Sequence, residues 1–249
     1  MSPSTSSQPR IVDALQRYWH DLAARDGVFR ATRQVLVAFW EFLRDSTPSR
    51  RKSRFGDADY DWDFRVNTTS GAVAWRDRLL GAFHSPYQPT EPALFHEMMN
   101  VLQKQVSLAE FTFLDLGSGK GRTLLMATDY PFRKIVGVEL LPALHETAQE
   151  NIARYQSESK KCLAIESICA DATAFRLPDG PVVVYLFNPF PESGLRRMLS
   201  NALESLRLNS RPMFLIYHNP QLERLFGDDP AWQKIAGTHQ YSIFQRPWC

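Results

Sequence analysis

The feature that most constrains the fold is a strand-like segment that leads directly into closely spaced glycines and then into a helical pattern. Residues 111–116 alternate aromatic and aliphatic side chains as a buried strand does, and Gly117, Gly119 and Gly121 follow. Residues 122–127 then form a good helix pattern. Glycines allow a tight turn and close approach to a ligand, and the start of a helix presents free N–H groups. The segment therefore predicts a turn that binds a phosphate or a nucleotide.

Two common glycine motifs do not fit this turn. A P-loop needs Ser or Thr after its Gly-Lys, whereas Lys120 is followed by Gly121. A dinucleotide fingerprint needs a third glycine at position 122, which is Arg122. What remains is the pattern Asp-x-Gly-x-Gly-x-Gly that begins at Asp115. A glycine-rich turn can also be no more than a turn, so the neighbouring segments must decide.

Two further segments predict strands that end in acids. Residues 135–139 form an apolar run that ends in Glu139, where a carboxylate can accept two hydrogen bonds from a ribose diol. Residues 164–170 read as a third strand, and Asp171 and Ala172 follow it. Because parallel strands end at one edge of a sheet, these acids belong on the ligand side.

A fourth apolar segment, 182–187, runs into Asn188. The order and spacing of the four strand ends resemble the class I methyltransferases that use S-adenosylmethionine (SAM), roughly over residues 85–249. The resemblance implies an α/β fold, namely a Rossmann-like, doubly wound, mostly parallel seven-stranded sheet in the order 3-2-1-4-5-7-6 with an N-terminal helical cap. It also implies SAM as the cofactor.

The resemblance assigns the cofactor-binding residues by position. Glu139 would bind the ribose, Asp171 and the Ala172 amide would bind the adenine, and Asp115 would orient the turn or bind the cofactor's amino group. The set at the turn and the next two strand ends is Asp115, Gly117, Ser118, Gly119, Glu139, Leu140, Asp171 and Ala172.

The segment after the fourth strand, Asn188-Pro189-Phe190, is a candidate catalytic site. It resembles the Asn-Pro-Pro-aromatic motif of amino-group methylases, with one proline missing. Asn188 and Phe190 are therefore candidate catalytic residues, and Asn188 also a cofactor contact, while a plain turn is the alternative. His218, after a predicted fifth strand, is a candidate general base or a core histidine.

The segment before the first strand adds two further candidates. Thr90 is a predicted N-cap of a helix that reaches about Lys104, with Pro92 in its first turn. An aromatic residue followed by Pro and Thr at this place resembles the non-SET lysine methylases, in which it folds over the methionine end of the cofactor. Tyr87 is thus a candidate for catalysis and cofactor binding, and Thr90 for cofactor binding.

The N-terminal third is expected to form a separate region. We expect a disordered tail over 1–10, a helical cap region over 11–84 and the methyltransferase domain over 85–249. Apolar stripes within 11–24 and 28–43 predict a helical hairpin, which we expect to cover the domain, with a homodimer through these helices as the alternative.

Three charged stretches have more than one interpretation. The basic run 50–54 is a solvated linker, a contact with an acidic partner surface or a contact with nucleic-acid phosphates. Acids alternate with aromatics over 57–64, which indicates an edge strand or a lid. Lys120 and Arg122 are expected to point to solvent, or else to meet the cofactor's carboxylate.

Composition excludes several classes of protein. A formal net charge of +2 argues against nucleic acid as a partner. The three cysteines are too few and scattered for a disulfide framework or a metal site, and we expect Cys162 and Cys169 to be core residues of strands. The polar start and the lack of long apolar runs predict a cytoplasmic protein with no membrane partner.

The predicted function is SAM-dependent methyl transfer to a nitrogen nucleophile, with a protein lysine ahead of other amines. Two alternatives remain open, a small-molecule methyltransferase and a SAM-binding helper subunit without turnover.

Overall fold

A computed structural model describes residues 58–69 and 88–247, together with Ala23, Gly27, Val28 and Thr32. The chain divides into two compact units, and residues 57–69 belong with 88–249 in the unit described below. The predicted tail, the helical hairpin, the basic run and Tyr87 lie outside the described residues, apart from those four positions. The division of the chain at residue 84 stays a prediction.

The unit is built on one seven-stranded sheet in the order β3-β2-β1-β4-β5-β7-β6, as the resemblance implied. Its first five strands are parallel, and β7 runs antiparallel to both β5 and β6. The strands are β1 (Thr112–Leu116), β2 (Lys134–Glu139), β3 (Ile165–Cys169), β4 (Val182–Phe187), β5 (Met213–His218), β6 (Gln233–Gly237) and β7 (Tyr241–Arg246).

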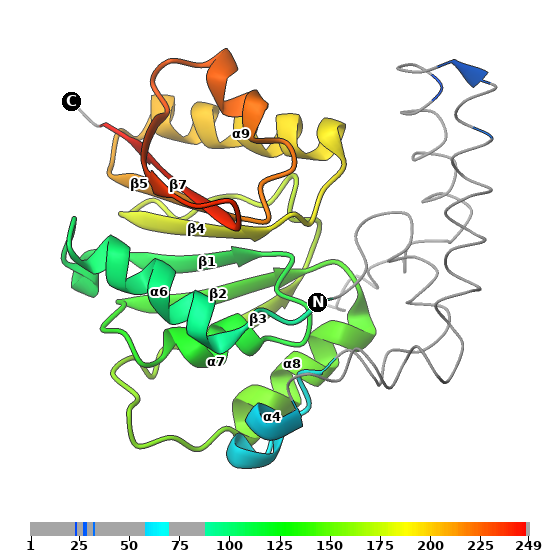
Figure 1. Ribbon diagram of the computed structural model, residues 1–249, viewed down its shortest axis with the longest axis vertical. Helices are drawn as coiled ribbons and strands as arrows, with labels where there is room; N and C mark the ends of the chain where they lie inside the picture. Colours follow the sequence, from blue (N-terminus) through cyan, green and yellow to red (C-terminus); the bar gives the residue numbers. More distant parts are fainter. Residues whose placement is uncertain (1–22, 24–26, 29–31, 33–57, 70–87, 248–249) are drawn as a thin grey trace, which may run out of the picture. The chain divides into compact units, whose positions relative to one another are not determined.

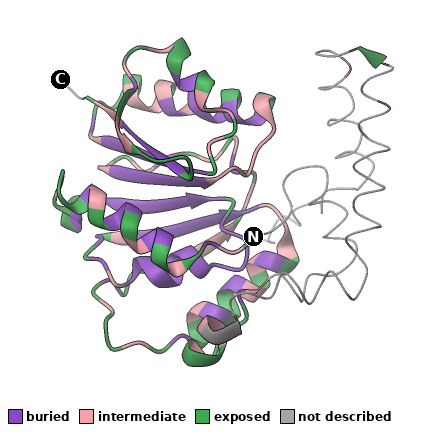
Figure 2. Cartoon of the chain, in the orientation of Figure 1, coloured by how far each residue is buried: buried purple, intermediate pink, exposed green. Residues whose placement is uncertain are grey.

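Helices cover both faces of the sheet (Figure 1). They are α4 (Ala58–Phe64), α6 (Pro92–Gln103), α7 (Arg122–Ala127), α8 (Pro142–Arg154) and α9 (Glu192–Leu208), with short 3-10 helices at Leu108–Glu110 and Glu223–Asp228. Phe113 packs with α6 and α7 on one face, and its neighbour Leu114 packs with α9 on the other. This alternation is the period of a strand covered on both sides, and the central strands are buried throughout (Figure 2).

The connections that follow β1 and β4 run to opposite faces of the sheet. Helix α7 follows β1 and packs on one face, whereas α9 follows β4 and packs on the other. Since β1 and β4 are neighbours, their carboxyl ends form the switch point of the sheet, where α/β folds bind ligands.

The predicted edge strand over 57–64 is wrong, because this segment is helix α4. Tyr60 and Phe64 are four residues apart, which places both on one helical face, and their ring centroids are 4.8 Å apart. Trp62 lies on another face and is 85% exposed. The alternation of acids and aromatics therefore suggested a strand, although the two aromatics that pack, Tyr60 and Phe64, have the spacing of a helix.

Two smaller predictions also need correction. Glu91, not Thr90, is the N-cap of α6, and it makes no side-chain capping bond. Pro92 opens the helix, where its fixed φ suits the first turn. Cys162 is buried but precedes β3, and Cys169, the last residue of β3, is exposed. None of the described helices is long and apolar enough to cross a membrane.

Candidate functional site

The glycine turn lies at the switch point and packs against the segment after β4. Gly117, Gly119 and Gly121 have positive φ values of 92°, 54° and 82°, which side chains with a Cβ rarely adopt. A Cβ on Gly117 would lie 2.6 Å from Cβ of Pro189. The turn and the Asn188 segment are therefore in direct contact.

Glu139 holds the turn through its carboxylate. It accepts hydrogen bonds from the N–H of Gly119 and from the N–H of Leu141, each at 2.8 Å. A carboxylate can accept several hydrogen bonds at once, and the sequence predicts that this one also binds a ribose diol. Glu139 thus joins β2 to the turn and faces the predicted ligand position.

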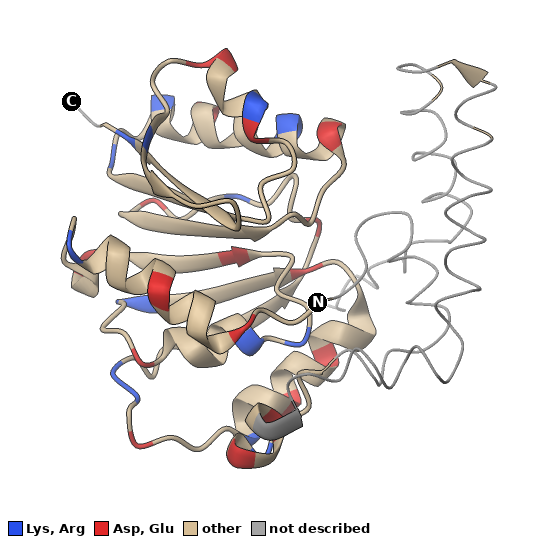
Figure 3. Cartoon of the chain, in the orientation of Figure 1, with Lys and Arg blue, Asp and Glu red and all other residues tan. Residues whose placement is uncertain are grey.

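Asp115 is buried in β1 and tied to the first turn of α7. The hydroxyl of Thr123 donates a hydrogen bond to its carboxylate. Burial raises the pKa of Asp115 to about 7, the Thr123 hydrogen bond opposes this, and the charge of Glu139 adds to it. The contact with α7 supports the predicted role of Asp115 in orienting the turn. Asp115 and Glu139 are the only acidic residues of β1 and β2, and they lie toward one end of the sheet (Figure 3).

Asp171 follows β3 in an exposed position. Its Oδ1 accepts hydrogen bonds from the backbone N–H and the hydroxyl of Thr173, at 2.9 and 2.7 Å. Its Oδ2 has no hydrogen-bond partner among the described residues, so one oxygen remains for a ligand. Ala172 beside it is buried. This arrangement is compatible with the predicted adenine contact.

The expected exposure of Lys120 and Arg122 is wrong. Their exposed fractions are 1% and 2%. The Lys120 Nζ donates to the carbonyl of Thr69 at 2.7 Å, and the Arg122 Nε donates to Thr68 Oγ1 at 2.6 Å. Both cations bind the segment that follows α4, which lies about fifty residues earlier in the chain and could not be paired with them by local pattern.

Asn188 has a fixed side chain at the end of β4. Its φ is 43°, a left-handed conformation that asparagine tolerates better than most residues. Its Oδ1 accepts a hydrogen bond from the hydroxyl of Tyr217 at 2.8 Å, and that hydroxyl accepts the N–H of Leu222 at 3.3 Å. Phe190 packs with the core on the α9 face of the sheet.

A chain of buried neutral groups lies at the ends of β4 and β5, on the face opposite the hydrogen bond between Asn188 and Tyr217. Thr90 Oγ1 is 2.9 Å from the hydroxyl of Tyr185, which is 2.8 Å from Nδ1 of His218. The ring of Phe187 stacks on His218 with centroids 3.8 Å apart. Burial lowers the pKa of His218 to about 4, so its imidazole is neutral at physiological pH.

The structure thus places the predicted residues along one edge of the sheet. Asp171, Glu139, the glycine turn, Asn188 and His218 follow the strands in the order β3, β2, β1, β4 and β5. Sequence reasoning did not single out Tyr185, Phe187 or Tyr217. Strand alternation could have indicated Tyr185 and Phe187, which face the same side as His218, whereas Tyr217 faces the other side with Leu186.

The chemistry of the edge suits a nucleoside-like ligand. Within the described part of the chain, no three His, Cys, Asp or Glu side chains form a group that could hold a metal ion. The Ser118 hydroxyl in the turn is buried and has no partner among the described residues. The acids, the glycine turn and the Ser118 hydroxyl at this edge are therefore groups of the kinds expected to bind SAM.

Comparison with known proteins agrees with this geometry. The family described as "Methyltransferase domain" matches residues 113–209, which extend from β1 to just past α9. No curated protein matches the chain.

Solved structures with a similar arrangement are distant in sequence. An RNA methyltransferase from Salinibacter ruber in complex with S-adenosyl-L-homocysteine is 18% identical over 64% of this chain and 92% of that chain, with a TM-score of 0.43. The putative methyltransferase yhhF of Escherichia coli is 19% identical over 66% of this chain and 89% of that one, with a TM-score of 0.44.

The family match covers the part of the chain that carries the predicted ligand edge. It includes the glycine turn, Glu139 at the end of β2, Asp171 after β3 and the segment after β4. The strand order is the one that the resemblance implied. Residues 113–209 therefore carry a methyltransferase domain, and S-adenosylmethionine is the cofactor expected for it.

Proposed function

We propose that this enzyme methylates a nitrogen nucleophile, the side-chain amine of a protein lysine ahead of other amines. The observation that carries the proposal is the setting of Asn188. A hydrogen bond from the hydroxyl of Tyr217 fixes its amide. Asn188 directly follows Phe187, whose ring stacks on His218. A fixed amide oxygen is an acceptor suited to the N–H of an amine.

The buried groups at the ends of β4 and β5, on the face opposite the hydrogen bond between Asn188 and Tyr217, favour a neutral amine over an ammonium ion. His218 is neutral, Phe187 is apolar, and burial raises the pKa of Tyr185 well above its usual range. An ammonium that enters such surroundings loses hydration without gaining an opposite charge, so its pKa falls. The nucleophile would thus arrive with its lone pair free.

His218 does not serve as the general base in this proposal. A group with a pKa of about 4 is too weak to take a proton from an alkylammonium, because efficient bases have pKa values near the working pH. We assign to His218 the positioning of Tyr185, and we expect the proton to leave to solvent before methyl transfer.

Cofactor binding is assigned to the carboxyl ends of β3, β2, β1 and β4. When bound, SAM supplies a methyl group on a positively charged sulfur, which an amine lone pair can accept with release of S-adenosylhomocysteine and a proton. The residues proposed to hold it are Asp115, Gly117, Ser118, Gly119, Glu139, Leu140, Asp171, Ala172 and Asn188, with Tyr87 and Thr90 at the methionine end. The chain's part in the reaction is alignment and exclusion of water.

The other two candidate catalytic residues, Phe190 and Tyr87, have roles in this proposal that differ from that of Asn188. Phe190 packs on the α9 side, and a Cβ on Gly194 would lie 3.1 Å from its Cβ. Its proposed contribution is to fix the position of Pro189 and Asn188. Tyr87, which lies outside the described residues, is proposed to contact the substrate.

Labelled methyl transfer tests the class of acceptor. The protein is incubated with SAM carrying a labelled methyl group and a cell extract, and the labelled product is hydrolysed. Label that resists base and nuclease and elutes with methyllysine is the expected result. Base-labile label would indicate a carboxyl ester and would overturn the nitrogen proposal. Nuclease-sensitive label would indicate a nucleic acid and would overturn the lysine acceptor.

A pair of glycine variants tests Asn188 itself. Asn188→Gly removes the amide but keeps the left-handed backbone without strain. We expect turnover to fall about a hundredfold, as when a transition-state contact is lost, with affinity for S-adenosylhomocysteine within about threefold of the parent. Asn219→Gly is the matched control, since Asn219 also has a positive φ, of 50°, after the neighbouring strand. Equal turnover in both variants would return Asn188 to the role of a plain turn.

A further inference from the structure

We propose that Asp61 is a positioning residue of the cofactor site. Through the segment 58–69 it would hold Lys120 and Arg122, and thereby the backbone of the glycine turn, in the geometry that binds the cofactor. The inference rests on the proposed use of that turn for SAM. It goes beyond it by including in the site a helix that precedes the sheet in sequence.

Asp61 folds the end of its own segment into a compact loop. Its Oδ2 accepts hydrogen bonds from the backbone N–H groups of Thr68 and Thr69, at 2.8 and 2.9 Å. Its Oδ1 accepts the hydroxyl of Thr68. One carboxylate therefore fixes the two residues that the cations of the turn contact.

The two cations of the turn bind this loop. Arg122 donates through Nε to Thr68 Oγ1 at 2.6 Å and lies 3.5 Å from Asp61 Oδ1 through Nη2. Lys120 donates to the carbonyl of Thr69 at 2.7 Å and to Asn67 Oδ1 at 3.2 Å. Since Lys120 stands between two glycines of the turn, its anchoring limits the turn directly.

A side chain of α8 joins the loop to the turn's backbone. Asn151 donates through Nδ2 to the carbonyl of Lys120 at 2.9 Å and to the carbonyl of Asn67 at 3.0 Å. Its Oδ1 accepts the N–H of Asn67 at 2.7 Å. The loop, the turn and α8 thus form one hydrogen-bonded unit.

The charges of this unit depend on Asp61. Lys120 and Arg122 are both buried, and the Asp61 side chain is 14% exposed. Burial lowers the pKa of Lys120 to about 8, with Asp61 opposing this and Arg122 adding to it. Removing the carboxylate would take a negative charge away from beside two neighbouring buried cations, which is costly, so the turn would shift to relieve them.

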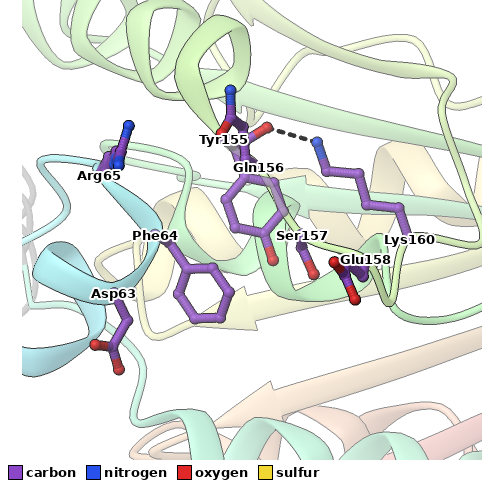
Figure 4. Close-up of a pocket in the computed structure, with 8 residues that line it drawn as sticks. All are labelled: Asp63, Phe64, Arg65, Tyr155, Gln156, Ser157, Glu158 and Lys160. Atoms are coloured by element: carbon purple, nitrogen blue, oxygen red, sulfur yellow. Dashed lines mark hydrogen bonds between the residues drawn. The ribbon is translucent and has the colours of Figure 1, made fainter.

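Aromatic contacts hold α4 in place independently of Asp61. The Arg122 guanidinium lies 4.9 Å from the centroid of the Tyr60 ring, and the rings of Phe64 and Tyr155 are 5.3 Å apart. Beside these rings, an open pocket of about 650 Å³ separates the end of α4 from residues 155–160 (Figure 4). Asp63 lines that pocket and is exposed, so it shares the helix with Asp61 without sharing its contacts.

The test compares Asp61→Asn with Asp63→Asn in the full chain. Asp61→Asn keeps size and polarity but removes the charge. We expect its Kd for S-adenosylhomocysteine, measured by calorimetry, to rise about tenfold, which corresponds to about 1.4 kcal/mol. We also expect faster hydrogen exchange at residues 117–123 without ligand, while exchange in β4 and β5 stays unchanged. Asp63→Asn should match the parent in both measurements.

Two outcomes would overturn the proposal, and one separates it from the function. The positioning role is contradicted if hydrogen exchange at residues 117–123 is the same in Asp61→Asn as in the parent. It is also contradicted if the Kd of Asp61→Asn for S-adenosylhomocysteine is within twofold of the parent's. If the parent protein itself fails to bind, the proposed function fails, and the exchange measurement still decides on Asp61. Thr68→Val, which removes only the hydroxyl that Arg122 contacts, should reproduce the faster exchange if Asp61→Asn does not fold.

Discussion

At the scale of single residues, two buried groups of the site respond to pH in opposite directions. Asp115 has a pKa of about 7 when folded and an ordinary value near 3.8, so between these values the folded chain holds a proton that the unfolded chain has lost, and stability falls as pH rises. His218 has a folded pKa of about 4 against 6.5, so between these values stability rises with pH. The two effects oppose each other over roughly pH 4 to 6.5.

Replacing Asp115 by Asn should separate these effects. Asn keeps an acceptor for the Thr123 hydroxyl but carries no charge to bury. We expect the free energy of unfolding at pH 8 to exceed that of the parent by about 1–3 kcal/mol, with the gain vanishing near pH 4. Urea unfolding from pH 4 to 8 measures this, and Asp179→Asn, at an exposed site, is the control. A difference that does not change with pH would contradict the assignment of a raised pKa to Asp115.

At the scale of elements, one buried arginine closes α9, the longest helix within the described part of the chain. Helix α9 ends at Leu208, and its last carbonyls need partners outside the helix. Arg211 donates to the carbonyls of Ser205 and Asn209, at 3.1 and 2.8 Å, and to the carbonyl of Gly180 at 3.1 Å. It therefore ties the end of α9 to the approach of β4, at the edge opposite the site.

Arg211→Met should destabilise the domain without affecting the site. The substitution removes the hydrogen bonds that Arg211 donates to these three carbonyls, and we expect the free energy of unfolding to fall by about 1–3 kcal/mol. Arg211→Lys should recover only part of this, since one ammonium cannot reproduce the fork of donors. Urea unfolding measures both, and exposed Arg176→Met is the control. Unchanged stability in Arg211→Met would refute the capping role, and a large loss of cofactor affinity would refute the separation of the two edges.

At the scale of the whole molecule, sequence predicted what is local and missed what depends on distant contacts. Strands β1 to β5 are apolar runs with acids, amides or glycines at their ends, so the sheet and its ligand edge could be read directly. Helix α4 was mistaken for a strand because its acids recur at a period of two, while the packing aromatics Tyr60 and Phe64 recur at four. The burial of Lys120 could not be predicted, since its partners Asn67 and Thr69 lie in a segment that local pattern assigned to another region.

The central claim, that the carboxyl edge of β3, β2, β1 and β4 binds SAM, is tested most directly by calorimetric titration with SAM and S-adenosylhomocysteine. We expect micromolar binding to the parent and at least about tenfold weaker binding to Asp171→Ala, which loses an exposed carboxylate and should fold normally. Asp179→Ala, an exposed acid just ahead of β4 at the other edge, should bind like the parent. Absence of binding to the parent, or equal affinity in the two variants, would contradict the account.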